Sequence, residues 1–156
     1  MRAIYGLAGI LPLLLAACAG GLQSEPVVEG SGTAADRAAD HALKMLGRPY
    51  RFGGATPSAG FDCSGLVRYS YRQAGISLPH NTDKQRQASR RVRLSELRRG
   101  DLLFFDQEGK KQSHVGIYLG GGKFVHAPSS GKEVRSDRLN SPYWTKHLSE
   151  ARRLVI

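Results

Sequence analysis

The hydrophobic pattern of the chain changes once, near residue 100, and this change constrains the fold more than any other feature. Before it, apolar residues recur at helical spacing in segment 34–46, with Thr33 or Ser31 as a candidate cap, and again from Asp62 or Cys63 to Gly75. After it, short apolar runs separated by glycine-rich or charged turns are typical of strands: 102–105, 114–119, 123–127 and 153–156. Helices followed by strands predict an α+β domain, with N-terminal helices packed on a central antiparallel β-sheet.

The composition is that of one globular domain with an excess of basic residues. The 156 residues carry 23 Lys and Arg against 13 Asp and Glu, a formal net charge of +10. Such a charge suits nucleic acid or a polymer rich in carboxylates. A nucleic-acid module needs aromatic residues for base stacking among its basic ones, and the most basic stretch, 84–99, has none. Nucleic acid is therefore not an expected partner. A short helix capped by Thr82 is expected in the polar segment 80–99.

The N-terminus has the pattern of an export signal. Arg2 is the only charge before Glu25, and the apolar stretch after it is too short to cross a bilayer as a helix. It ends in Leu15-Ala16-Ala17-Cys18, which resembles the lipobox of bacterial lipoproteins, where the cysteine is acylated. The alternative is an ordinary signal peptide followed by a chance cysteine.

This reading divides the chain into three parts. Residues 1–17 are predicted to be a lipoprotein signal peptide, 18–33 the acylated Cys18 and a flexible tether, and 34–156 the folded domain. Ala19, rather than Asp, after the cysteine is similar to sorting to the outer membrane in Gram-negative cells. We therefore expect attachment to the periplasmic face of that membrane through the lipid.

Cys63 is the candidate nucleophile. If Asp62 caps the second helix, the thiol lies at the helix N-terminus among free backbone N–H groups, where the dipole should lower its pKa. The alternative is a buried cysteine that acts as a small apolar residue.

Two histidines on neighbouring strands favour the catalytic interpretation. His114 opens one strand, His126 ends the next, and Gly120–Gly122 between them suit a hairpin turn. A three-residue loop would pair Leu119 with Lys123 and place both imidazoles on one face, whereas a two- or four-residue loop would separate them. The interpretation therefore predicts an odd-numbered loop.

Together, Cys63, His114 and His126 form a candidate nucleophile, base and base-orienting residue. The same three side chains could instead ligate zinc, although no carboxylate has an obvious general-base position in that arrangement. His41, His80 and His147 have no such constellation, and we expect them to have only local partners.

Five ordered blocks of sequence resemble the NlpC family of papain-like cysteine peptidases, which cut peptide bonds in bacterial peptidoglycan. The blocks are 49–54 (PYRFGG), 61–67 (FDCSGLV), 100–102 (GDL), 114–118 (HVGIY) and 124–127 (FVHA), and the resemblance runs from about residue 35 to 156. It implies that Cys63 is the nucleophile, His114 the base and His126 the third polar residue. It also implies that Tyr50 helps to hold the oxyanion or substrate, and that Asp62 and Ser64 line the substrate groove. For Asp62 a plain helix cap is the structural alternative.

Segments 141–144 and 150–153 further resemble the lipoprotein murein endopeptidases of Gram-negative bacteria, and His80 stands where these relatives lead us to expect Arg or Lys. The resemblance implies a lipid-anchored endopeptidase that cuts the D-alanyl–diaminopimelate cross-link and needs no cofactor or metal. The alternatives are a cut at the D-glutamyl–diaminopimelate bond of the stem peptide, or a catalytically idle wall-binding lipoprotein. Expected partners are peptidoglycan stem peptides and the membrane, with a monomeric chain and any adaptor or controlling protease left unidentified.

Overall fold

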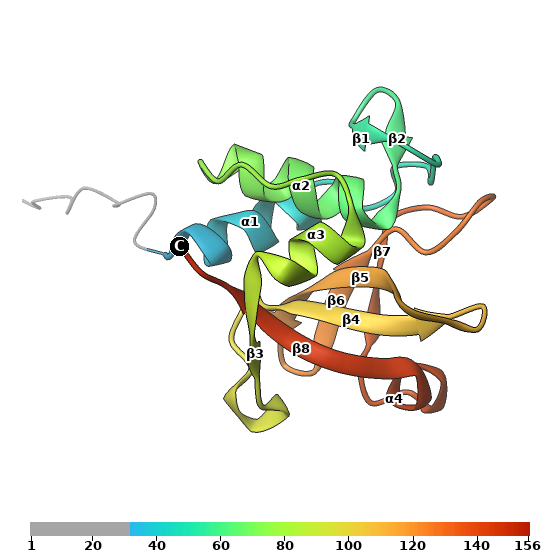
Figure 1. Ribbon diagram of the computed structural model, residues 1–156. Helices are drawn as coiled ribbons and strands as arrows, with labels where there is room; N and C mark the ends of the chain where they lie inside the picture. Colours follow the sequence, from blue (N-terminus) through green and yellow to red (C-terminus); the bar gives the residue numbers. More distant parts are fainter. Residues whose placement is uncertain (1–31) are drawn as a thin grey trace, which may run out of the picture.

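The computed structural model describes residues 32–156, which form a layer of helices packed on one sheet (Figure 1). The predicted signal peptide and most of the tether, including Cys18, lie outside the described residues. Within 32–156, no helix is long and apolar enough to cross a membrane.

The expected helices are present, with shifted ends. α1 (Ala34–Leu43) is capped by Thr33 in a capping box with Asp36, and α2 (Cys63–Gln73) is capped by Asp62. α1 ends three residues before the expected Leu46. The chain turns after Leu43, and the Gly47 N–H donates to the Val134 carbonyl at 2.9 Å and not to a carbonyl of the helix. The remaining helices are short: α3 (Thr82–Gln87), η1 (Leu94–Glu96) and α4 (Pro142–His147). The cap of α3 is Asn81 rather than the predicted Thr82.

The central sheet has six strands in the order β3-β8-β4-β5-β6-β7, and every adjacent pair is antiparallel, as predicted. The strands are β3 (Ser89–Val92), β4 (Leu102–Gln107), β5 (Lys110–Gly120), β6 (Lys123–His126), β7 (Arg135–Arg138) and β8 (Leu148–Leu154). A small separate hairpin, β1 (Ala55–Thr56) with β2 (Gly60–Phe61), precedes α2. The edge strands β3 and β7 were not predicted, because their sequences are polar and lack an apolar run.

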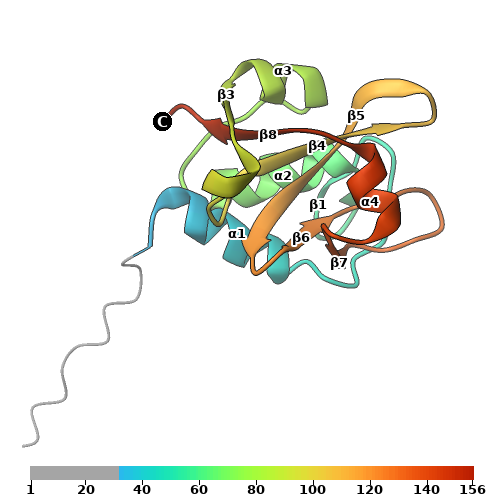
Figure 2. The ribbon, with the colours of Figure 1, turned by 90° about the horizontal axis from the view of Figure 1, so that it is seen from below.

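Both faces of the sheet are covered, which explains why segment 102–105 is apolar without alternation. Leu102 and Phe104 face the helical layer and belong to the main core with α1 and α2. Leu103 and Phe105 face the other way, into a smaller core closed by Trp144 of α4. Figure 2 shows α4 on the side of the sheet opposite α2.

The β5–β6 hairpin corrects one detail of the sequence interpretation. Tyr118 pairs with Phe124 as expected, but Lys123 pairs with Gly120 instead of Leu119, so the turn holds only Gly121 and Gly122. Leu119 is the extra residue of a β-bulge. A two-residue turn alone would put the two histidines on opposite faces of the sheet, and the extra residue in the strand returns them to the same face. The predicted loop length was therefore wrong, yet both imidazoles lie on one face of the sheet.

We predict that Gly65→Ala destabilises the fold at the start of α2. A Cβ at this position would lie 1.9 Å from the Gly54 carbonyl oxygen and 2.8 Å from Asp62 Oδ1, so helix and loop would have to separate. Urea unfolding should show a loss of about 1–3 kcal/mol. Gln73→Ala, at the exposed end of the same helix, is the control and should change little. Equal stabilities of the two variants would contradict this close-packing argument.

Candidate active site

Four segments distant in sequence meet at one end of the molecule. The β1–β2 hairpin, the N-terminal end of α2, the β4–β5 hairpin and the loop from β6 to β7 lie together there in both views (Figures 1 and 2). Cys63, the first residue of α2, is partly buried at this end and is a free thiol. Its sulfur lies 3.9 Å from Thr82 Oγ1, and the backbone of Val115, the residue after His114, lies near enough to lower the pKa of the thiol. The nucleophile candidate and the base candidate therefore occupy neighbouring positions.

The two imidazoles form a hydrogen-bonded pair inside the protein. His114 Nε2 lies 2.8 Å from His126 Nδ1, and the side chains are 3% and 0% exposed. The indole of Trp144 stacks on the ring of His114, with centroids 5.8 Å apart and planes 22° from parallel. Such packing fixes the orientation of both rings.

Asp137, on β7, extends this pair to a third member. Its Oδ2 lies 3.0 Å from His126 Nε2 and accepts hydrogen bonds from Trp144 Nε1 at 2.9 Å and Arg135 Nη2 at 2.9 Å. The hydrogen bonds outweigh burial, so the pKa of the Asp137 carboxyl is lowered and the group is ionised at neutral pH. The sequence analysis missed this residue, because a charged segment such as 135–138 carries no strand pattern that would place it beside His126.

The geometry determines where the protons lie. An ionised Asp137 can only accept, so His126 carries its proton on Nε2 and its Nδ1 is an acceptor. His114 must then donate to it from Nε2, which leaves the Nδ1 of His114 as the unprotonated nitrogen. That nitrogen is the one available to take a proton from a thiol.

Burial keeps both histidines neutral. Burial, together with the nearby His126, lowers the pKa of His114 to about 3, against the opposing effect of Asp137. Burial also lowers the pKa of His126, to about 4, against the opposing effect of Asp137. Cys63 differs from the expectation: burial raises the pKa of its thiol, and the hydrogen bonds at Val115 and Thr82 only partly oppose this. The resting pair is a thiol beside a neutral base.

The contacts within residues 32–156 include no hydrogen bond between the Cys63 sulfur and either imidazole. Catalytic hydrogen bonds are often long in ligand-free structures and tighten when substrate binds. No group of three or more His, Cys, Asp and Glu side chains with metal-binding geometry occurs among the same residues. The facing nitrogens of His114 and His126 are occupied by their mutual hydrogen bond.

Asp62 is a helix cap with further partners. Its Oδ1 accepts from the Gly65 N–H at 2.7 Å, and its Oδ2 accepts from the Gly53 N–H at 2.9 Å. Ser64 is buried and its hydroxyl donates to the same carboxylate at 3.3 Å. His80 Nε2 lies 2.7 Å from Asp62 Oδ1, so its partner is 18 residues away in the sequence and not a local one as expected. The carboxylate thus joins three segments around the nucleophile.

Tyr50 reaches the site through a bridge between its backbone and β2 at Phe61. Burial raises the pKa of its hydroxyl, and Cys63, when it is a thiolate, and the Asp62 carboxylate raise it further. The phenol therefore remains protonated and can donate a hydrogen bond to a developing oxyanion.

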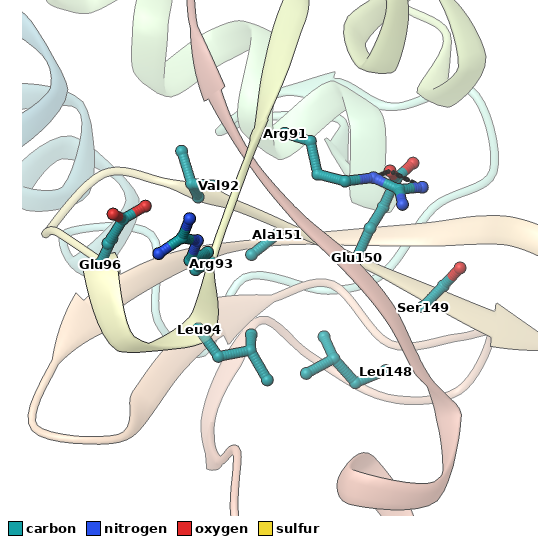
Figure 3. Close-up of a pocket in the computed structure, with 9 residues that line it drawn as sticks. All are labelled: Arg91, Val92, Arg93, Leu94, Glu96, Leu148, Ser149, Glu150 and Ala151. Atoms are coloured by element: carbon teal, nitrogen blue, oxygen red, sulfur yellow. Dashed lines mark hydrogen bonds and ion pairs between the residues drawn. The ribbon is translucent and has the colours of Figure 1, made fainter.

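A hollow on another part of the sheet lies away from these residues. It has a volume of about 530 Å³ and runs along β3 and β8, between Arg91, Leu94, Leu148 and Glu150 (Figure 3). None of Cys63, His114 and His126 lines it, so its size does not make it the site of the chemistry.

Several known proteins are similar to this chain in sequence and in fold. The chain is 41% identical over 118 residues to murein DD-endopeptidase MepH of Escherichia coli, covering 72% of this chain and 43% of that protein. It is 42% identical over 123 residues to the bifunctional muramidase/DL-endopeptidase CwlT of Bacillus subtilis, covering 78% and 37%. The crystal structure of a lipoprotein-like NLP/P60 protein from Staphylococcus aureus superposes with a TM-score of 0.70 at 41% identity, covering 79% of this chain and 42% of that one.

This chain thus spans less than half the length of these relatives. The model of the NlpC/P60 family matches residues 47–153, which include Tyr50, Cys63, His114 and His126. The chain therefore belongs to the NlpC/P60 family, with its α+β, papain-like fold.

Proposed function

We propose that this protein is a cysteine endopeptidase of peptidoglycan. The observation that carries the proposal is the hydrogen-bonded series Asp137–His126–His114, which leaves His114 Nδ1 unprotonated while the backbone of the next residue, Val115, lies beside the Cys63 thiol. Relatives named as murein endopeptidases support the substrate class. The basic net charge of +10 suits a polymer that carries free carboxylates.

The proposed reaction has two steps. His114 Nδ1 takes the thiol proton of Cys63 as the sulfur attacks the scissile carbonyl, and the resulting imidazolium gives that proton to the leaving amine when the C–N bond breaks. The product is a thioester on Cys63. In the second step, His114 takes a proton from water, the hydroxide attacks the thioester carbonyl, and the proton returns to the departing sulfur.

Two donors are suited to the oxyanion of each tetrahedral intermediate. The hydroxyl of Tyr50 is protonated, and the backbone N–H of Cys63 lies in the first turn of α2, where helix N–H groups have no partner within the helix. Asp62 and Ser64, which hydrogen-bond to each other, are proposed to line the substrate groove.

The bond we propose for cleavage is the D-alanyl–diaminopimelate cross-link, consistent with the DD-endopeptidase relative. The D-glutamyl–diaminopimelate bond of the stem peptide is the second candidate, because a relative of equal identity is named a DL-endopeptidase. We further propose that Cys18 is acylated and holds the protein on the periplasmic face of the outer membrane. The support is the segment Leu15-Ala16-Ala17-Cys18 with Ala19 after it.

We predict that Cys63→Ala abolishes cleavage while the fold is retained, because the nucleophile is lost and a small side chain replaces a partly buried one. Purified peptidoglycan would be digested with the full-length protein in detergent and the products identified by chromatography and mass spectrometry. Loss of cross-linked dimers with a matching gain of monomers indicates the cross-link, and truncated stem peptides indicate the D-glutamyl bond. Gln73→Ala is the control. Activity retained by Cys63→Ala, or lost on addition of a chelator, would contradict the mechanism.

Asp137→Asn should lower kcat by roughly 10- to 100-fold with little change in KM. The amide can donate to His126 Nε2, which would reverse the tautomers of both imidazoles and protonate the nitrogen that His114 needs free. Asp40→Asn, which alters only an exposed ion pair with Arg99, is the matched control. A change in KM alone, or an equal effect of both variants, would show that Asp137 does not position the relay.

The acid limb of kcat/KM should lie below pH 6.5, the ordinary pKa of histidine. Burial lowers the pKa of His114 to about 3, so the base stays unprotonated as the pH falls through 6 and 5. The same shift makes folding less favourable on acidification, because the unfolded chain binds protons below pH 6.5 that the folded one does not. Circular dichroism at each pH separates unfolding from loss of the base, and a limb near 6.5 in folded protein would refute the assignment.

A further inference from the structure

A second hollow, smaller and charged, adjoins the histidine pair. Its volume is about 360 Å³, and its lining comes from three segments. The β4–β5 hairpin gives Gln107 and Glu108, the loop after β6 gives Pro128, Ser129 and Lys132, and β7 with α4 gives Arg135, Tyr143 and Trp144.

The hollow shares a wall with the candidate active site. Trp144, which lines it, stacks on His114 and donates a hydrogen bond to Asp137. Arg135, also in the lining, donates to the same carboxylate. On the other side, the Lys132 carbonyl accepts the N–H of Tyr50 at 2.8 Å, which ties the rim of the hollow to the proposed oxyanion residue.

Two cations in this lining have capacity for an anion. The ammonium of Lys132 is in no ion pair with any residue of 32–156, and its residue is exposed to solvent. Arg135 uses Nε and Nη2 on Asp137, which leaves Nη1 without a bond to the described part of the chain. Glu108 stands on the hairpin across the hollow and forms no ion pair within the same residues. The hollow therefore offers positive charge on one wall and negative charge on the other.

The chemistry of the proposed reaction indicates which part of the substrate lies in this hollow. The leaving amine must receive its proton from His114, so the residue that carries this amine lies against the His114 side of the site. In both candidate bonds that residue is diaminopimelate. In the cross-link, the carbon that bears the scissile nitrogen also bears a free carboxylate. In an uncross-linked stem, the far end of the residue carries a carboxylate and an ammonium group together.

We propose that this hollow is the subsite for the free carboxylate of the diamino acid on the leaving-amine side, with Lys132 as its ligand. Arg135 Nη1 assists Lys132, and Glu108 meets the ammonium group when the diamino acid is not cross-linked. This inference rests on the proposed endopeptidase activity, and it adds a determinant of substrate choice. A substrate with lysine in place of diaminopimelate lacks only the carboxylate, so it should lose the contribution of Lys132.

The test compares two synthetic cross-linked dimers, one with diaminopimelate and one with lysine as the amine donor. For the full-length protein in detergent, kcat/KM should be higher on the diaminopimelate dimer. Lys132→Gln should lower that value about five-fold, the effect of one partly exposed ion pair, and should leave cleavage of the lysine dimer unchanged. The control is Lys123→Gln, an exposed lysine at the opposite end of β6 from His126, which should alter neither value.

Equal effects of Lys132→Gln on the two dimers, or no effect on either, would overturn the subsite. If the unmodified protein cleaves neither dimer, the proposed function fails. The subsite is then tested on its own by measuring how tightly the diaminopimelate dimer binds. Calorimetry on Cys63→Ala with the diaminopimelate dimer should show binding that Cys63→Ala/Lys132→Gln weakens about five-fold. Binding that is unchanged by Lys132→Gln, or no binding at all, would overturn it.

Discussion

The carboxylate of Asp62 is the contact on which the rest of the site depends. It closes the first turn of α2 through the Gly65 N–H, holds the loop before β1 through the Gly53 N–H, and pairs with His80 ahead of α3. Because Cys63 is the next residue, these bonds place the nucleophile relative to three segments at once. The missing Cβ of Gly65 lets helix and loop approach closely enough for this to happen. His80 supplies the third contact at the position where the resemblance led us to expect Arg or Lys.

Burial decides how the proposed nucleophile is activated. A thiol at a helix N-terminus is expected to ionise readily, but desolvation of Cys63 raises its pKa, and desolvation of His114 lowers the pKa of the base. The two shifts disfavour a preformed thiolate–imidazolium pair and favour proton transfer during attack. A protonated thiol also reacts slowly with oxidants, which suits a free cysteine in the oxidising compartment proposed for this protein.

The sequence predicted those parts of the fold that have an apolar pattern. β4, β5 and β6 stand out because they are buried, and the pattern identified the strands of His114 and His126, although the common face of the two rings depended on the turn between them. Even there, the bulge at Leu119 changed the turn from three residues to two without changing the outcome. β3 and β7 have no such pattern, since two of the four residues of Ser89–Val92 and three of the four of Arg135–Arg138 are charged. The roles of Asp137 and of His80 were missed because their contacts, with His126 and with Asp62, join residues that only the tertiary fold brings together.

The polarity of β7 has a physical reason that connects the edge of the sheet to the chemistry. An edge strand exposes unpaired backbone groups, and charged side chains on it discourage pairing with other chains. β7 is such an edge, so it can carry Arg135 and Asp137 without disturbing a core. The Asp137 carboxylate on it reaches inward to the neutral His126, while Arg135 lines the hollow that Lys132 also lines. The same four-residue strand thus fixes the proton positions of the proposed base and supplies charge to the proposed substrate subsite. A change in β7 should therefore affect both the rate of the reaction and the binding of substrate.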